Sequence, residues 1–225
     1  MPVKVKICGL TRTVDIERSI EYGADLLGFI FGYKTSPRNL EFERLKELVS
    51  LVPPNVSTVV VSPASNPELA KAAKEINPTL FQLHGEPSYG LQKTIGFKRI
   101  VQTVRPSEQE ANMVEKCLKL TSNCTGILYD ASSHYNPNQL DQISQGEKKD
   151  NYWSSLWAIT RKVRDGISPF PLILAGGLND GNVEAAIKIV KPYAVDVSTG
   201  VESRSGVKDD VKLKRFIHNA KSALD

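Results

Sequence analysis

A cysteine and an aspartate each stand where a short apolar run of the sequence ends. Cys8 follows the run Val3–Ile7, and Asp130 follows Gly126–Tyr129. A thiol can act as a general base or nucleophile where a nearby positive charge lowers its pKa, and a carboxyl group can act as a general acid. Each residue alone has a simpler explanation, Cys8 as a small buried apolar residue and Asp130 as a turn residue or helix cap. Facing one cavity from opposite sides, the pair can hold and transform a sugar-sized ligand.

Two glycine-bearing turns follow later apolar runs. Backbone N–H groups in such turns bind phosphate in many barrels, because they direct partial positive charge at the anion. A double glycine by itself predicts only a turn, so the phosphate interpretation depends on both turns lying after neighbouring strands. The residues concerned are Gly176 and Gly177 after Pro171–Ala175, and Ser198, Thr199 and Gly200 after Ala194–Val197.

Four further polar residues lie at or near the ends of apolar runs: Arg38, Gln82, His84 and Asp196. Arg38 can grip a carboxylate with two parallel hydrogen bonds, although an exposed loop arginine is the commoner situation. His84 is a candidate for a polar wall or a proton carrier. The His, Cys and acidic residues lack the spacing of a ligand cluster, so we expect no metal site. Three cysteines without a C-x-x-C pair also disfavour a disulfide framework.

These residues need elements that bring them together, and the sequence alternates about eight short apolar runs with segments of helical period. Most runs lack regular polar alternation, as expected of parallel strands covered on both faces. We therefore predict a single (β/α)8 barrel over residues 1–225, in which every strand ends at the same mouth. An open doubly wound sheet is the alternative, but it commonly has only five or six strands. The predicted strands are Val3–Ile7, Leu26–Phe31, Ser57–Val61, Thr79–Leu83, Lys98–Val104, Gly126–Tyr129, Pro171–Ala175 and Ala194–Val197.

One polar segment, residues 131–152, interrupts this alternation after the predicted sixth strand. It contains Asn136-Pro137-Asn138 and a run of charged residues from 147 to 150. Loops of this length inside a compact domain are usually functional lids or disordered insertions. We expect a long loop on the catalytic face of the barrel.

Composition excludes several classes of protein. With 40% hydrophobic and 24% charged residues, the chain is not a disordered protein. Its net charge of +4 is spread through helical segments with acids between the cations, which disfavours nucleic-acid binding. No apolar run approaches the roughly 18 residues of a membrane helix, and no signal peptide is evident. We expect a cytoplasmic protein with free thiols and a small-molecule substrate, either monomer or homodimer.

The motifs together resemble the phosphoribosylanthranilate isomerase family of tryptophan biosynthesis. They occur in the family's order and in the expected strand slots almost from end to end. The resemblance implies a (β/α)8 barrel that needs no cofactor and performs an Amadori rearrangement of N-(5′-phosphoribosyl)anthranilate. The motifs are Lys6-Ile7-Cys8-Gly9-Leu10-Thr11, Ser36-Pro37-Arg38, Gln82-Leu83-His84-Gly85, Leu174-Ala175-Gly176-Gly177-Leu178 and Val195-Asp196-Val197-Ser198-Thr199-Gly200-Val201-Glu202.

Carried over residue by residue, the resemblance implies that Asp130 is the general acid and Cys8 the general base. Asp130 would protonate the furanose ring oxygen and open the ring to an iminium, after which Cys8 would remove the C2′ proton. Arg38 would hold the anthranilate carboxylate, and Asp196 would lie near the substrate nitrogen. Gln82 and His84 would line the substrate site, and the turns at 176–177 and 198–200 would take the phosphate.

The sequence departs from the family at three places. Most members carry a Gly-Gly-Thr-Gly-type loop after the catalytic aspartate, whereas this chain reads Ile143-Ser144-Gln145-Gly146-Glu147. Tyr129 stands where a small aliphatic residue is usual, and Gln102 where lysine is frequent. A phosphate-ligand-binding barrel without catalysis is therefore one alternative. Another is the sister sugar isomerase of histidine biosynthesis, but that enzyme uses aspartate at both catalytic positions, so Cys8 argues against it.

Overall fold

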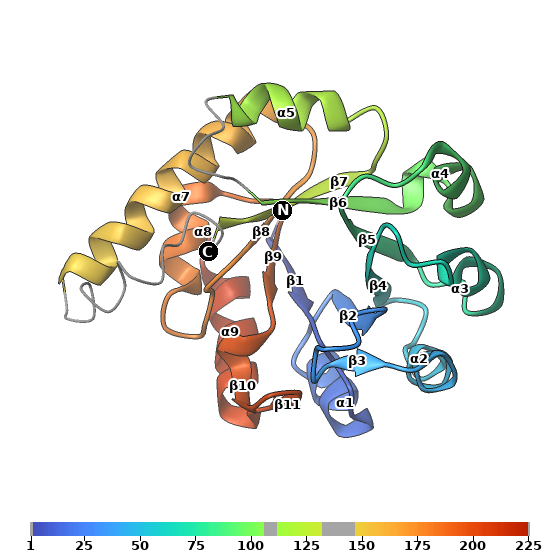
Figure 1. The fold of residues 1–225 in the computed structure, drawn as a ribbon. Helices are drawn as coiled ribbons and strands as arrows, with labels where there is room; N and C mark the ends of the chain where they lie inside the picture. Colours follow the sequence, from blue (N-terminus) through green and yellow to red (C-terminus); the bar gives the residue numbers. More distant parts are fainter. Residues whose placement is uncertain (1, 106–111, 132–146, 225) are drawn as a thin grey trace.

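The computed structural model describes residues 2–105, 112–131 and 147–224, and its central feature is a closed parallel barrel. Neighbouring barrel strands pair in chain order, and β1 pairs with both β2 and β9, which closes the ring. Figure 1 shows the strands at the centre with the helices around them. The barrel strands are β1 (Lys4–Ile7), β2 (Leu26–Phe31), β4 (Ser57–Pro63), β5 (Leu80–His84), β6 (Ile100–Val104), β7 (Gly126–Asp130), β8 (Leu172–Ala175) and β9 (Ala194–Val197). The predicted (β/α)8 barrel is confirmed.

Helices follow the strands and cover the outside of the barrel (Figure 1). They are α1 (Thr13–Glu21), α2 (Phe42–Ser50), α3 (Leu69–Glu75), α4 (Tyr89–Ile95), α5 (Met113–Leu120), α7 (Glu147–Ile167), α8 (Val183–Val190) and α9 (Asp210–Ser222). Smaller elements are β3 (Asn39–Leu40), the hairpin of β10 (Glu202–Arg204) and β11 (Val207–Lys208), and the 3-10 turns η1 (Phe97–Arg99) and η3 (Thr199–Val201). None of the helices in the described part of the chain combines the length and apolar character needed to cross a membrane.

The last helix, α9, illustrates how the sequence specifies these elements. Asp209 caps it, because its side chain accepts a hydrogen bond from the Lys212 backbone N–H at 3.0 Å. Such a cap stabilises a helix by about 1 kcal/mol. The residues at three- and four-residue spacing turn inward and are buried, namely Leu213, Phe216, Ile217 and Ala220. The apolar period in the sequence therefore marks the face that packs on the barrel.

Strand residues alternate between the barrel interior and the helix layer. In β1, Val5 and Ile7 pack in the large cluster beneath the helices, whereas Cys8 joins Val59 and Val61 in a small separate cluster. Because side chains two positions apart on a strand share a face, Lys6 turns to the same side as Cys8. The barrel interior therefore holds a fully buried lysine beside the candidate base.

Residues 132–146 of the expected polar loop, including the atypical stretch 143–146, lie outside the described residues. The loop was expected to run to residue 152, but α7 begins at Glu147. Glu and Lys are strong helix formers, and a polar composition is shared by surface loops and surface helices. Polarity alone therefore placed the end of the loop about two turns too late.

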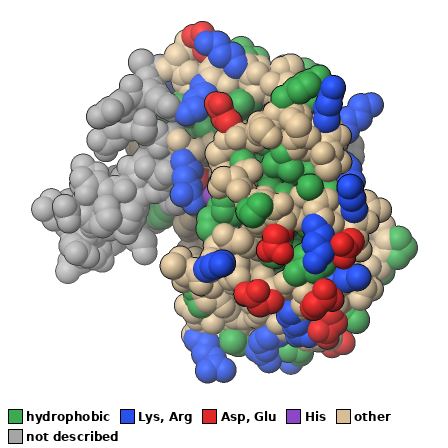
Figure 2. All heavy atoms as spheres, turned by 45° about the vertical axis from the view of Figure 1, so that its right-hand side comes forward, with side chains coloured by type: hydrophobic (Ala, Val, Ile, Leu, Met, Phe, Trp, Pro, Cys, Tyr) green, Lys and Arg blue, Asp and Glu red, His purple; other side chains and the backbone are tan. Residues whose placement is uncertain are grey.

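The surface carries both signs of charge. On the side of the molecule that bears α3 and α4, lysine and arginine side chains are interspersed with acidic ones (Figure 2). The ion pairs within helices show the same mixture, as in Lys188 with Glu184 of α8, where Nζ and Oε1 are 2.5 Å apart. The charge pattern in this view differs from the single basic patch that nucleic-acid binding proteins present.

Candidate active site

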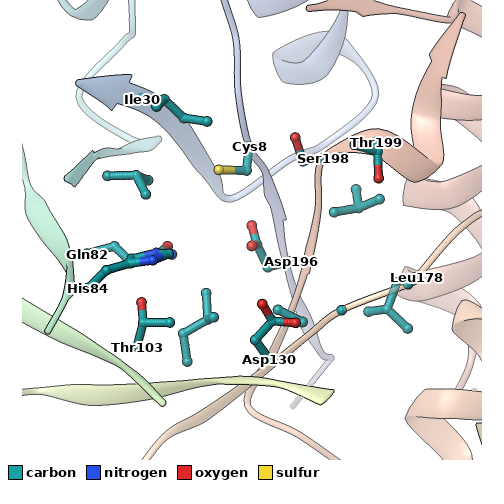
Figure 3. A pocket seen from close by; sticks show the side chains of 16 residues that line it. Cys8, Ile30, Gln82, His84, Thr103, Asp130, Leu178, Asp196, Ser198 and Thr199 are labelled. Carbon is teal, nitrogen blue, oxygen red and sulfur yellow. The ribbon is translucent and has the colours of Figure 1, made fainter. Parts of the chain in front are cut away.

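The carboxyl ends of the strands surround a cavity of about 240 Å³. Cys8 lines it directly after β1, and Asp130 lines it as the last residue of β7. Figure 3 shows the Cys8 sulfur and the carboxylates of Asp196 and Asp130 facing the same space. Gln82 and His84 of β5 lie on another wall of it. The structure thus brings five of the predicted site residues together, while their chemical roles stay predictions.

Both predicted phosphate turns reach the same cavity. Gly176, Gly177, Ser198 and Thr199 line it next to Asp196. Gly200 is not part of the lining, and close packing against the turn after β8 requires glycine at this position. A Cβ on Gly200 would stand 1.9 Å from the Leu178 carbonyl oxygen, so only glycine lets the turns after β8 and β9 touch.

The Cys8 thiol is buried, and its surroundings act on its pKa in opposite directions. Burial, the largest effect, raises the pKa of the Cys8 thiol, and the Asp196 carboxylate raises it further. The ammonium groups of Lys6 and Lys208 oppose the shift. The net direction is upward, so at neutral pH the protonated thiol predominates in the ligand-free site.

Lys6 is buried next to the cavity-lining residues Cys8 and Asp196, and its sequence position alone did not suggest a role in the site. Its Nζ lies 2.7 Å from Oδ1 of Asp196, and the two residues are register partners on β1 and β9. The side chain of Lys6 is only 1% exposed. A lysine two positions before Cys8 within an apolar run was a signal for an inward-facing cation, because of the two-residue period of strands.

Arg38 makes a two-pronged ion pair with Glu202. Its Nε lies 2.8 Å from Oε1 and an Nη lies 2.5 Å from Oε2 of this carboxylate. Arg38 is not among the residues lining the cavity, although its side chain packs over Gly9 beside Ser198. Two of its five N–H donors are therefore engaged by the protein itself, and three remain. Its contact with a substrate carboxylate stays a prediction.

His84 is held in its neutral form. Burial, with help from the charges of Arg105 and Lys6, lowers the pKa of His84 to about 4. Its ring meets Tyr33 edge-on at a centroid distance of 5.6 Å, and its Nε2 lies 3.4 Å from Nε2 of Gln82. Because an imidazole with this pKa is almost entirely neutral near pH 7, the lowered pKa of His84 favours a polar wall over a proton carrier.

We expect a His84→Gln variant to resist mild acid better than the wild type. The unfolded imidazole binds its proton near pH 6.5 and the folded one only near pH 4. The contribution of neutral His84 to wild-type stability is therefore fully present above pH 6.5. It is lost as the pH drops toward 4, because the unfolded state binds the proton at a higher pH than the folded state. Urea unfolding measures the free energy of unfolding of both proteins at pH 7 and pH 4.5. Between these two pH values the variant should gain about 1 to 3 kcal/mol in this free energy relative to the wild type. A difference independent of pH would mean that this imidazole is not shifted.

Two buried polar atoms on the cavity wall have no hydrogen-bond partner within the described residues, namely Oε1 of Gln82 and Oγ1 of Thr103. Buried polar groups are nearly always paired, so the lack of a partner at these two atoms is unusual. Thr103 was not singled out from the sequence, since a threonine inside a strand gives no distinctive signal. Gln102, where the family often has lysine, instead braces the loop after β5, donating from Nε2 to the carbonyl oxygens of Leu83 and Gly85.

Within residues 2–105, 112–131 and 147–224, no group of three or more His, Cys, Asp or Glu side chains is arranged to hold a metal ion. What gathers at the mouth is a thiol, two carboxylates and two glycine-bearing turns. Fold and site together define the class of (β/α)8 barrels whose strand ends hold titratable side chains suited to acid–base chemistry.

Comparison with known proteins narrows this class to one family. The family model for N-(5′-phosphoribosyl)anthranilate (PRA) isomerase matches residues 5–219. The chain belongs to this family.

Relatives and solved structures match over nearly the whole chain. The N-(5′-phosphoribosyl)anthranilate isomerase of Trichlorobacter lovleyi is 38% identical, covering 99% of this chain and all of the relative. The Pseudomonas putida enzyme is 36% identical, covering 98% of both chains. The crystal structure of the Thermotoga maritima enzyme superposes with a TM-score of 0.77 at 32% identity, covering 97% of this chain and 98% of the other. Another solved isomerase, with a TM-score of 0.76, contains reduced 1-(o-carboxyphenylamino)-1-deoxyribulose 5-phosphate.

Proposed function

We propose that this chain catalyses the Amadori rearrangement of N-(5′-phosphoribosyl)anthranilate to 1-(2-carboxyphenylamino)-1-deoxyribulose 5-phosphate, a step of tryptophan biosynthesis. Asp130 is the general acid and Cys8 the general base. The observation that carries this proposal is that both groups line one cavity together with the turns after β8 and β9. That arrangement fits a phosphorylated pentose with its reacting carbons between the two side chains.

The first step is ring opening. The protonated Asp130 carboxyl donates its proton to the furanose ring oxygen, and the C1′–O bond breaks. The nitrogen lone pair forms the C1′=N bond of an iminium, and the Asp130 carboxylate is left beside the newly formed hydroxyl group. General acid catalysis of this kind typically contributes a factor of about 10² to 10⁴.

The second step is removal of the C2′ proton. The iminium makes this proton more acidic, and its positive charge favours the Cys8 thiolate over the thiol by attraction. The thiolate takes the proton, the C–H electrons form the C1′=C2′ bond, and the iminium nitrogen regains its lone pair. The resulting enolamine tautomerises to the ketone. The raised pKa of Cys8 in the ligand-free site is thus offset at the moment when the cation forms.

Binding groups surround these two residues. The turns at 176–177 and 198–199 supply backbone N–H groups for the phosphate, and Asp196 faces the substrate nitrogen. Arg38 takes the anthranilate carboxylate with the donors that Glu202 leaves over, beside the turn at Ser198. Oε1 of Gln82 and Oγ1 of Thr103 offer hydrogen bonds to the sugar hydroxyls. We place the reaction in the cytoplasm, where the thiols of Cys8, Cys117 and Cys124 stay reduced.

The test is turnover of substrate generated in solution. Anthranilate and phosphoribosyl pyrophosphate are coupled by an anthranilate phosphoribosyltransferase, and the purified chain should then consume the product, as followed by anthranilate fluorescence. The aminoimidazole substrate of histidine biosynthesis serves as the comparison and should react far more slowly. Binding of a product analogue with no conversion would show a binding barrel instead. The gene should also restore growth of a tryptophan auxotroph that lacks this isomerase.

A further inference from the structure

The stability of the barrel does not explain why the charged side chain of Lys6 is buried in its interior. Its side chain is 1% exposed, and its ammonium is paired with Asp196, whose side chain is 11% exposed. Replacing a buried ion pair with apolar side chains of similar volume is often neutral or stabilising, so the pair is weak evidence for stability. The cation therefore calls for a role in the site around it.

The geometry places this ammonium against the candidate base. Lys6 of β1 and Cys8, which directly follows the strand, turn to the same side of the chain, opposite Gly28 of β2. The point at which a Cβ on Gly28 would stand is 2.9 Å from the Cys8 sulfur and 3.1 Å from the Lys6 Nζ. Because Gly28 has no side chain, the Cys8 sulfur and the Lys6 ammonium both lie next to the small space in front of its Cα atom.

A second buried lysine is nearby, but its donors are used. Nζ of Lys208 donates to the carbonyl oxygens of Cys8 and Ser198, at 2.7 and 3.0 Å, and to Oε1 of Glu202 at 3.0 Å. An ammonium has three N–H donors, so none is left for the sulfur. Lys6 gives one donor to Asp196, which leaves donors that can face Cys8.

We propose that Lys6 is a positioning residue for the proposed base Cys8. The buried ammonium of Lys6 stabilises the negative charge of the Cys8 thiolate, and the ion pair with Asp196 fixes the lysine side chain in place. This inference rests on the proposed function of Cys8. Lys6 keeps its proton throughout: the thiolate accepts the C2′ proton of the substrate, and the resulting thiol later loses it to product or solvent.

The charges around Cys8 agree with this role. Lys6 on β1 and Lys208 on β11 favour the thiolate, whereas Asp196 on β9 disfavours it. Arg38, a further cation that interacts with Cys8, is directed to Glu202. Burial raises the pKa of the thiol, and the Lys6 charge is the largest of the opposing effects. Without Lys6 the buried thiolate would lie beside the Asp196 carboxylate and would keep only the weaker effect of the Lys208 charge in its favour.

The experiment measures the thiol directly. Alkylation of Cys8 by iodoacetamide is followed against pH on the Cys8-containing peptide by mass spectrometry. In Lys6→Met the midpoint should rise by about one pH unit or more, since an opposite charge at this range moves a pKa by one to three units.

The kcat at pH 7 should fall about tenfold or more, in line with the smaller thiolate fraction, with KM within about threefold of wild type. Lys208→Met is the matched control and should shift the alkylation midpoint less.

A second comparison guards against misfolding, because Lys6→Met leaves the Asp196 carboxylate buried and unpaired. The double variant Lys6→Met/Asp196→Asn carries no such charge, and its midpoint should lie above that of Asp196→Asn alone. Equal midpoints in these two folded variants would overturn the proposal, as would a Lys6→Met midpoint equal to that of wild type. The alkylation does not depend on turnover. A shifted midpoint in a chain that fails to convert the substrate would reject the proposed function and keep the Lys6–Cys8 coupling.

Discussion

A Cys8→Ala variant should lose at least about a hundredfold in kcat/KM for N-(5′-phosphoribosyl)anthranilate. The sulfur of Cys8, the proposed base, lines the cavity directly after β1, and alanine removes it with little change in shape. Water in its place is a far weaker base than a thiolate and is not held at C2′. Because the base acts only in the transition state of proton transfer, we expect the loss in kcat, with KM nearly unchanged. Steady-state kinetics on freshly generated substrate measure both constants.

Cys124→Ala is the matched control for this experiment. Cys124 is a half-buried free thiol, and its Sγ donates a hydrogen bond to the Leu120 carbonyl oxygen, away from the cavity. Its replacement should leave kcat/KM within about twofold, because surface substitutions remote from a site have small effects. A near-normal rate in Cys8→Ala would remove the base from the proposed mechanism, and an equal loss in Cys124→Ala would point to general damage to the fold.

The barrel could be predicted from sequence because its strands are short, apolar and bounded by polar residues. The ranges Leu26–Phe31 and Ala194–Val197 agree with β2 and β9 residue for residue. Parallel strands also bring all their carboxyl ends to one mouth, so the closeness of Cys8 and Asp130 followed from their slots alone. The segment 147–152 was misjudged because polar residues occupy both surface loops and surface helices.

The pairing of buried charges could not be predicted in this way. Lys6 meets a carboxylate 190 positions further along the chain, and Arg38 meets Glu202 across 164 positions. Lysine is almost never fully buried unless paired. The strand period indicated that Lys6 faces inward, but its carboxylate partner could not be identified until the chain was placed in three dimensions. The strand slots predicted that Cys8 and Asp130 lie at one mouth, whereas the ion pair of Lys6 with Asp196 depends on the three-dimensional pairing of β1 with β9.

An Asp130→Asn variant should likewise lose at least about a hundredfold in kcat/KM. The carboxyl group lies at the end of β7 on the cavity wall, and the amide keeps its shape but cannot donate an acidic proton to the ring oxygen. Nε of Arg105 lies 3.6 Å from Oδ2 of Asp130, and Arg105 is 62% exposed, so losing this pair has little effect on stability. We therefore expect a folded variant that binds reduced product analogue with nearly wild-type affinity and turns over almost no substrate.

The separation of binding from turnover is what identifies Asp130 as the acid. A residue needed only to hold the ligand would change the dissociation constant of the analogue and the rate together. Asp165→Asn, which alters an exposed aspartate of α7 on the outside of the barrel, is the control and should change neither quantity. Calorimetry gives the affinity and the fluorescence assay the rate. If Asp130→Asn turned over substrate at a rate close to wild type, ring opening would need a different proton donor. The position of the Asp130 carboxyl group across the cavity from the Cys8 thiol would then not explain the reaction.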